Sequence, residues 1–326
     1  MKRLFLGLLM LLVPGSEATE WTVVGEVPVL GVPEEISDLG DGSYLITFRD
    51  FSDCGYFLRG ILVNGSGLVT DSSMIIQPEA SGSFFEPLMP TEQDFLEMRI
   101  PEGVVRLNGV GDTLWTSVLD SITGYEGSRS LVIPSSSGGC WAVFGPESGS
   151  DEWRVWRLSS SGSTEASGTF NLQGGPVNSM HDMVECMDGG LLMTGVTDSL
   201  GMQLYSVLVR LDSGCGEMWR LLDEVHFHAC GDLVEIAGDG SIFVAGYTGL
   251  ERHDGWFMPP EGMDVFLYSL DCEGAFLMKS ILHLPGQNAP MLMTLLDGGG
   301  AVLLVSSFEE NSSFPGVYTL VTFSPD

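Results

Sequence analysis

The chain has 326 residues, of which 13 are Lys or Arg and 44 are Asp or Glu, and its formal net charge is −31. Nucleic-acid binding depends on clustered Lys and Arg side chains that neutralise phosphates, so this charge excludes nucleic acid as a partner. An anionic membrane surface is disfavoured for the same reason. Lys2 and Lys279 are the only lysines, which argues against a P-loop or a Schiff-base enzyme.

The first segment in chain order, residues 1–18, has the pattern of a signal peptide. Two basic residues precede an apolar run from Leu4 to Val13, and the small residues Ser16 and Ala18 precede the expected cleavage point. The apolar run is shorter than the roughly 20 residues that a membrane-spanning helix needs. We therefore predict a mature protein that is secreted or periplasmic, without membrane insertion.

A repeated phrase follows, in which a Gly-containing turn separates two apolar segments. It occurs six times and opens near residues 41, 81, 137, 188, 239 and 297, as DGSYLITF, SGSFFEPL, SGGCWAVF, DGGLLMTG, DGSIFVAG and DGGGAVLL. Glycine accepts the positive φ that tight hairpin turns require, so each copy predicts a β-hairpin. The copies recur every 40 to 58 residues, a period typical of four-stranded propeller blades. The sequence therefore predicts an all-β fold, a six-bladed β-propeller of antiparallel blades over residues 19–326.

A second hairpin follows the first within a copy. VVRLNGVGDTLWTSVLD and LVRLDSGCGEMWRLLDE show it best, with Arg106 and Arg210 each nine residues before Trp115 and Trp219. Two hairpins per copy predict four strands per blade.

The sixth copy ends with VYTLVTFSPD, after its third strand, while EWTVVGEVPVL at residues 20–30 is similar to the TLWTSVLD strand that closes an earlier copy. We therefore predict that the N-terminal strand pairs with the last copy. Such pairing removes the open sheet edges that promote aggregation.

The phrase DGGLLMTGVT, a variable loop and then LVRLDSGCGEMW together resemble the repeat of bacterial exported β-propeller proteins, whose blades read approximately DGGYIVAGYT, loop, LIKLDSNGNVLW. The resemblance extends over nearly the whole mature chain and is weakest in the second copy, where EPLMPTEQ replaces the usual ending. It implies a propeller fold and export. Proteins of this kind are mostly uncharacterised, so the resemblance implies no site residue.

The six cysteines are irregularly spaced and form no CxxC motif, which argues against a thioredoxin-like centre and a covalently attached haem. Export permits disulfides, but the sequence does not choose among the possible pairings. A chain of this length buries a large core without such cross-links.

The search for catalytic motifs finds no GxSxG, HExxH or Walker sequence, and we predict neither a catalytic residue nor a cofactor. One metal candidate is the segment HFHAC, in which His226, His228 and Cys230 alternate and share one face of an extended strand. Imidazole nitrogen and thiolate sulfur suit zinc or copper. Ordinary packing or exposure of these three side chains is the favoured interpretation.

The longest variable loop, residues 249–264, combines carboxylates with adjacent aromatic side chains. Its ligand candidates are Asp254, Trp256, Phe257 and Asp264. Loops held by a rigid scaffold carry many binding functions, and aromatic side chains are common anchors for sugar or protein. The alternative is a loop whose aromatic side chains pack on the blade beneath it.

Two functions remain open at this point. The first is a non-enzymatic binding or scaffold protein, a monomer that binds a protein or glycan ligand through the face that carries the variable loops. The alternative is a carbohydrate-active hydrolase or lyase, with loop carboxylates such as Asp254 and Asp264 as acid and base.

Overall fold

The computed structural model describes most of the chain from Thr19 onward. The described residues are 19–27, 32–39, 43–52, 55–64, 68–76, 89–90, 94–99, 103–108, 112–119, 130–145, 152–172, 178–199, 203–223, 229–249, 251–253, 256–258, 263–296, 299–308 and 315–325. The predicted signal peptide lies outside them.

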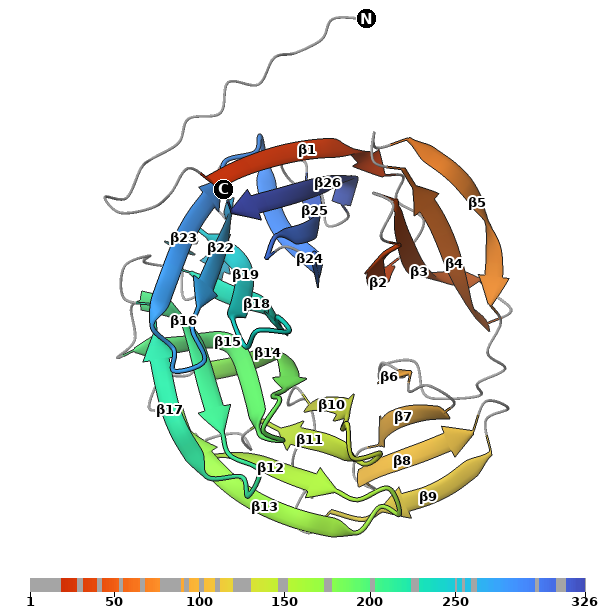
Figure 1. The fold of residues 1–326 in the computed structure, drawn as a ribbon, viewed down its shortest axis with the longest axis vertical. Helices are drawn as coiled ribbons and strands as arrows, with labels where there is room; N and C mark the ends of the chain where they lie inside the picture. The colour runs from red at the N-terminus through yellow and green to blue at the C-terminus, as the bar shows by residue number, and fades with distance from the viewer. Residues whose placement is uncertain are drawn as a thin grey trace, which may run out of the picture.

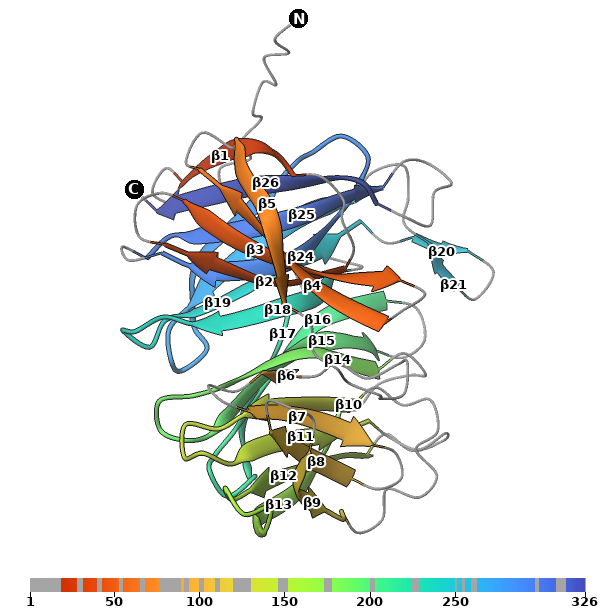
Figure 2. The ribbon, with the colours of Figure 1, turned by 90° about the vertical axis from the view of Figure 1, so that its right-hand side faces the viewer.

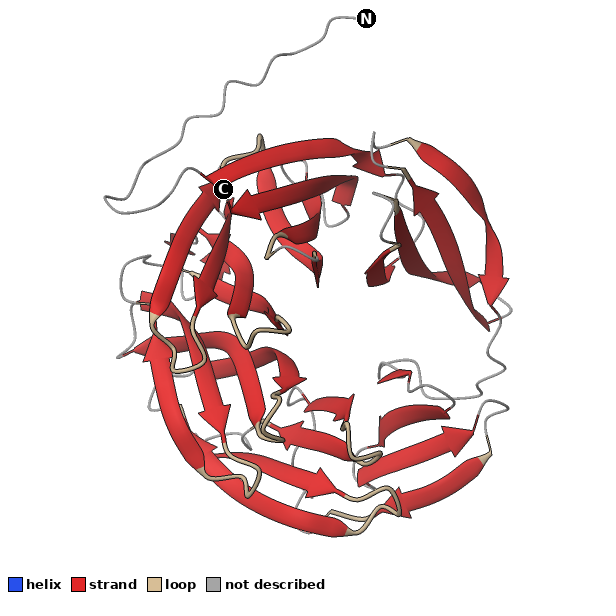
Figure 3. Ribbon diagram, viewed as in Figure 1, coloured by secondary structure: helices blue, strands red, loops and turns tan. Residues whose placement is uncertain are grey.

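The described residues form six four-stranded antiparallel sheets (Figure 3). Sheet 1 consists of β2 (Val32–Asp38), β3 (Tyr44–Ser52), β4 (Gly55–Val63) and β5 (Val69–Ile76). Sheet 2 consists of β6 (Met89–Pro90), β7 (Asp94–Arg99), β8 (Gly103–Asn108) and β9 (Thr113–Ser117). Sheet 3 consists of β10 (Ser130–Pro134), β11 (Cys140–Phe144), β12 (Glu152–Leu158) and β13 (Thr164–Asn171).

The remaining sheets are built in the same way, with two differences. The short pair β20–β21 is inserted between two strands of sheet 5, and the fourth strand of sheet 6 comes from the start of the chain. Sheet 4 consists of β14 (Asn178–Glu185), β15 (Leu191–Ser199), β16 (Gln203–Leu211) and β17 (Glu217–Leu222). Sheet 5 consists of β18 (Cys230–Ile236), β19 (Ile242–Thr248), β22 (Asp264–Leu270) and β23 (Phe276–Leu282). Sheet 6 consists of β24 (Gln287–Leu295), β25 (Ala301–Phe308), β26 (Pro315–Pro325) and β1 (Thr19–Val27). The predicted all-β architecture of four-stranded repeats is confirmed.

The N-terminal strand completes the last sheet. β1 pairs with β26 in antiparallel register, with Thr22 opposite Thr322 and Val27 opposite Tyr318. The prediction that the N-terminal strand supplies the missing strand of the sixth repeat is therefore confirmed. The two ends of the described chain are joined by the hydrogen bonds of one sheet.

The sheets succeed one another around the molecule, with the first strand of each sheet toward the middle and the last strand at the periphery (Figure 1). Among the first strands, β24 packs against both β2 and β18, β18 packs against β14, and β14 packs against β10. No helix in the described part of the chain is long and apolar enough to cross a membrane.

The hydrophobic core lies between neighbouring sheets. The described clusters of buried side chains join sheet 2 to sheet 3, sheet 3 to sheet 4, sheet 4 to sheet 5, sheet 5 to sheet 6 and sheet 6 to sheet 1. Trp141 and Trp153 of sheet 3, for example, pack with Met193 and Val209 of sheet 4. Sheets 3, 4, 5 and 6 each therefore pack on the sheets on either side.

The recurring turn residues have structural roles. In the second hairpins of sheets 4 and 5, the carboxylate of Asp212 accepts hydrogen bonds from the amides of Gly214 and Gly216, and that of Asp271 from the amides of Glu273 and Ala275. Aspartate favours such turns because its side chain satisfies the turn's own amides. The Leu-Asp pair that precedes each of these two turns, at residues 211–212 and 270–271, is therefore part of the turn signal.

The recurring tryptophans connect one sheet to the next. The Trp115 ring of β9 packs on Gly162, in the second turn of sheet 3, where an added Cβ would lie 2.7 Å from the ring. Trp219 of β17 packs in the same way on Gly274 of sheet 5, with the corresponding distance 3.4 Å. Trp115 also donates its indole N–H to the Ser160 carbonyl, at 2.9 Å. The regular Trp spacing therefore reflects packing between sheets.

One of the predicted turn positions is wrong. In sheet 2, Met89 pairs with Leu96 and Pro90 with Phe95, so the first turn follows Pro90 and not residue 81. That turn contains no glycine, and the glycine pattern therefore does not indicate it. In sheet 6 the first turn lies between β24 and β25, near residue 297 as predicted, and Gly299 has a positive φ there.

Candidate functional site

The predicted ligand loop contains a small hairpin. β20 (Glu251–His253) pairs with β21 (Trp256–Met258), and Figure 2 shows this pair projecting beyond the strands of the six sheets. Trp256 and Phe257 lie on β21, and Asp254 lies outside the described residues. Asp264 begins β22, and its Oδ2 is 2.7 Å from Nδ1 of His283. The structure therefore places two candidates on a projecting hairpin, and a third contacts His283.

Three carboxylates of the variable loops have side chains that the structure describes. Glu152 is 3.3 Å from Arg154, Asp198 is buried, and Asp264 contacts His283. The carbohydrate-active alternative remains a hypothesis.

Only one of the three predicted metal candidates lies in the described part of the chain. His226 and His228 lie outside the described residues, whereas Cys230 is the first residue of β18. The structure brings Cys230 together with two residues that the sequence analysis did not select, His181 of β14 and Asp232 of β18. The other described cysteines, Cys140, Cys186, Cys215 and Cys272, are free thiols.

His181 and Asp232 are each the extra, unpaired residue of a β-bulge. The register between β14 and β15 shifts between Met180 and Asp182, which leaves His181 as the extra residue, and the register between β18 and β19 shifts between Gly231 and Leu233, which leaves Asp232. The first strands of sheets 1 and 6 have bulges at the equivalent position. A bulge redirects side chains out of the regular alternation of a strand and is common beside functional sites.

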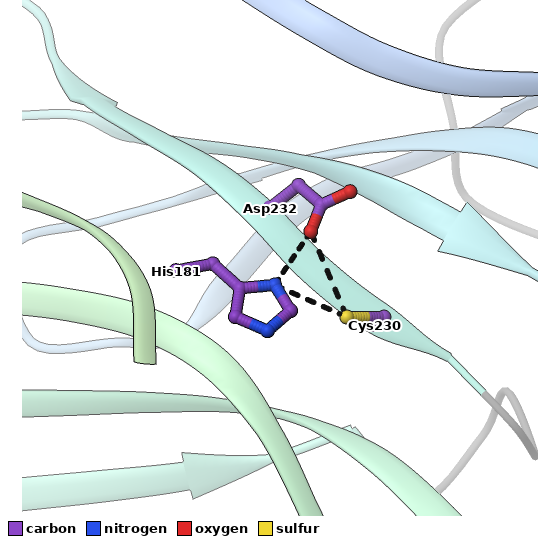
Figure 4. Close-up of side chains that lie close together, drawn as sticks. All are labelled: His181, Cys230 and Asp232. Atoms are coloured by element: carbon purple, nitrogen blue, oxygen red, sulfur yellow. Dashed lines mark hydrogen bonds and ion pairs between the residues drawn. The ribbon is translucent and has the colours of Figure 1, made fainter. Parts of the chain in front are cut away.

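The three side chains converge (Figure 4). His181 Nδ1 is 2.6 Å from Asp232 Oδ1 and 3.3 Å from Cys230 Sγ, and Cys230 Sγ is 3.7 Å from Asp232 Oδ1. The Cys230 residue is buried, while 11% of the His181 side chain and 21% of the Asp232 side chain are exposed. The cluster therefore lies at the interface of sheets 4 and 5 with a narrow exposure to solvent.

Close packing of sheets 4 and 5 holds the cluster together. Gly231 lies between two of its members, and an added Cβ there would be 2.3 Å from Thr194 Oγ1 and 2.6 Å from Ser206 Oγ. Only glycine lets the β18 backbone approach sheet 4 this closely. The carboxylate of Asp182 adds a polar connection, since it accepts hydrogen bonds from the amides of Met183 and Val234.

Two partly buried carboxyl groups on the strands that carry the cluster, Asp182 of β14 and Glu235 of β18, have raised pKa values. The pKa of Asp182 is raised to about 6, mainly by burial and also by the charge of Asp232, against the hydrogen bonds from Val234 and Met183. Burial also raises the pKa of Glu235 to about 7, with a smaller contribution from the charge of Asp182. A cation bound nearby would favour the ionised form of both groups.

The geometry argues against a Cys-His-Asp nucleophile. A catalytic relay needs the thiol at one imidazole nitrogen and the carboxylate at the other, so that a proton passes through the ring. Here Cys230 Sγ and Asp232 Oδ1 both face Nδ1 of His181. The three atoms form a compact set of nitrogen, sulfur and oxygen donors, which is an arrangement of potential metal ligands.

The missed residues carried a sequence signal. His181 and Asp232 each lie seven residues before the aspartate of an Asp-Gly turn, Asp188 and Asp239 respectively. Both residues therefore occupy the same position of their repeats, which proximity of His and Cys along the chain does not reveal.

No protein-family model matches the sequence, and no curated protein matches it. Among solved structures, a member of the DUF4221 family from Bacteroides vulgatus ATCC 8482 is similar, with 9% sequence identity and a TM-score of 0.48. The alignment covers 95% of this chain and 97% of that chain. At this level the likeness supports no conclusion about this protein.

Proposed function

We propose that the protein is an exported six-bladed β-propeller. Six four-stranded sheets in sequence order support this assignment, together with a last sheet that combines the final three strands with the first. Buried clusters join sheets 2 through 6 in succession and sheet 6 to sheet 1. Export rests on the predicted signal peptide at residues 1–18.

The function that fits this architecture is non-enzymatic binding of a protein or glycan. Its main support is the β20–β21 hairpin, which is inserted between two strands of sheet 5 and projects from the sheets (Figure 2). Lys279 has structural contacts, since its Nζ is 3.3 Å from the buried Asp223 carboxylate and 3.7 Å from the centre of the Phe276 ring.

A double variant of the hairpin, Trp256→Ala with Phe257→Ala, tests this function on a glycan array and in pull-downs from secreted material. The expected result is loss of ligand binding with an unchanged melting temperature, because the hairpin lies outside the four-stranded sheets. Leu277→Ala is the matched control, since Leu277 is an exposed apolar residue on the peripheral strand β23.

Acrylamide quenching of tryptophan fluorescence provides a second measurement. A quenchable component that disappears in Trp256→Ala supports recognition by the hairpin. Wild-type binding by the double variant, or a lowered melting temperature with unchanged binding, contradicts the proposal and indicates a hairpin that packs on its own sheet.

A further inference from the structure

We propose that His181, Cys230 and Asp232 bind a zinc ion through Nδ1, Sγ and Oδ1 respectively. This metal site differs from the HFHAC candidate of the sequence, with which it shares only Cys230. It is independent of the ligand-binding hairpin on β20 and β21.

The donor set selects the metal. Zinc is bound by Cys sulfur, His nitrogen and Asp oxygen, and sites with three protein ligands keep a fourth position for water or another ligand. Thiolate disfavours calcium and magnesium, which prefer oxygen ligands. The ionised forms of Cys230 and Asp232 would together neutralise the two positive charges of the ion. The formal charge of −31 on the whole chain attracts cations from solution.

The distances between donor atoms are close to those of a tetrahedral site. Ordinary zinc bond lengths place nitrogen and sulfur, or sulfur and oxygen, about 3.6 Å apart, and nitrogen and oxygen about 3.3 Å apart. The two distances from Cys230 Sγ are 3.3 Å and 3.7 Å. The 2.6 Å between His181 and Asp232 is a hydrogen bond, which must open by about 0.7 Å for both atoms to ligate zinc.

The fold holds these donors before any ion binds. His181 and Asp232 are the extra residues of bulges on adjacent first strands, so each side chain is fixed by the register of its own sheet. Gly231 keeps β18 close to sheet 4. Little ordering is therefore needed on binding, which favours affinity.

One proton is released when the site is filled. The Cys230 thiol must lose its proton to ligate as thiolate, and that proton goes to solvent. A neutral His181 ligates through Nδ1 as the tautomer whose proton is on Nε2, so its hydrogen bond to Asp232 Oδ1 is lost and both atoms are free to bind the metal. No oxidation or reduction takes place.

Cobalt is the probe that distinguishes this site from nonspecific carboxylate binding. We expect the metal-free mature protein to bind one equivalent of Co²⁺, with visible d–d bands of a tetrahedral site and a thiolate-to-cobalt charge-transfer band. Addition of Zn²⁺ should displace the cobalt, whereas excess Ca²⁺ should not. Absence of the charge-transfer band in the wild-type protein would overturn the proposal.

Matched variants assign the ligands. Cys230→Ser should abolish the charge-transfer band, and His181→Ala and Asp232→Asn should weaken zinc binding by more than the 10–100-fold typical of an outer-shell change. Cys186→Ser alters another buried thiol, and His283→Ala breaks a similar His–Asp contact of 2.7 Å. Both controls should bind zinc as the wild type does.

Folding of each variant is checked by circular dichroism before metal is added. If Cys230→Ser does not fold, His181→Ala and Asp232→Asn still decide the assignment. Wild-type affinity in both of these variants would contradict the proposal, as would equal losses in the control variants.

Discussion

At the scale of single residues, side chains that join two sheets govern the stability of this fold. Glu185, the last residue of β14, accepts hydrogen bonds from Ser135 Oγ at 2.6 Å, from the Ser136 amide at 2.5 Å and from Trp141 Nε1 at 3.2 Å. Partial burial would raise the pKa of Glu185, but these donors outweigh it and hold the pKa below its ordinary value of 4.5. The carboxylate therefore attaches sheet 4 to the first turn of sheet 3.

Glu185→Gln should lower the free energy of unfolding near neutral pH by about 1.5–3 kcal/mol, the contribution of hydrogen bonds to a charged group. Because the folded-state pKa is depressed, this contribution is fully present above pH 4.5 and is lost as the pH falls through the folded-state pKa. Urea unfolding between pH about 7 and about 3 measures it. A deficit that is independent of pH contradicts the assignment, and the more exposed Glu217→Gln is the control.

The glycine of the GVT and GYT endings lies close to the backbone of the first strand in sheets 4 and 5. An added Cβ would lie 2.0 Å from the Ser179 carbonyl at Gly195 and 2.0 Å from the Cys230 carbonyl at Gly246. Glycine at these two positions is therefore explained by the close approach of two strands.

Gly246→Ala should destabilise the protein by about 3 kcal/mol or more, because the clash is with backbone and overpacking commonly costs 1–3 kcal/mol. Gly238→Ala, where an added Cβ meets nothing within 4 Å, should be nearly neutral. The difference between the two urea midpoints is the measurement. Equal midpoints would show that β18 adapts to the extra methyl group without cost.

At the scale of elements, the sequence was most informative where one turn fixes one hairpin. The Asp-Gly turns at 188 and 239 have the predicted positive φ at Gly189 and Gly240. The prediction failed in sheet 2, whose first turn has no glycine. A glycine-containing turn therefore predicted a hairpin correctly only where the turn itself contains glycine.

The aspartate that opens a second hairpin provides a test at this scale. Asp271→Ala removes two hydrogen bonds, at 3.0 Å to the Glu273 amide and 2.8 Å to the Ala275 amide. The expected loss is about 1–2 kcal/mol of unfolding free energy, and Asp271→Asn should recover most of it because the amide oxygen still accepts. Loss without recovery in the asparagine variant would indicate that charge, and not the turn, is responsible.

The candidate site shows what one linear sequence does not predict. His181 and Cys230 are 49 residues apart in the chain, and they meet because two neighbouring sheets place their first strands side by side. The bulges that add His181 and Asp232 change the direction of side chains by one position, and alternation along a strand does not predict them. The sequence indicated Cys230 as a possible metal ligand, but it did not indicate His181 or Asp232 as its neighbours.

At the scale of the whole molecule, the N-terminal strand links the beginning of the chain to its end. Deletion of residues 19–31 should expose the edge of β26 and lower the melting temperature by about 10 °C or more, if the lost strand contributes several kcal/mol at about 2–4 °C per kcal/mol. Calorimetry of the full and truncated mature proteins measures this difference. Equal melting temperatures would contradict a closing role for β1.

Disulfide trapping across β1 and β26 tests closure of the proposed propeller most directly. Thr22 lies opposite Thr322, whereas Thr319 pairs with Glu26, so the variant with Thr22→Cys and Thr322→Cys should form an intramolecular cross-link under mild oxidation. The variant with Thr22→Cys and Thr319→Cys should not. Peptide mapping by mass spectrometry identifies the linked residues. Efficient linkage in the first variant alone is the predicted result, and no linkage, or equal linkage in both variants, would contradict a ring closed by its N-terminal strand.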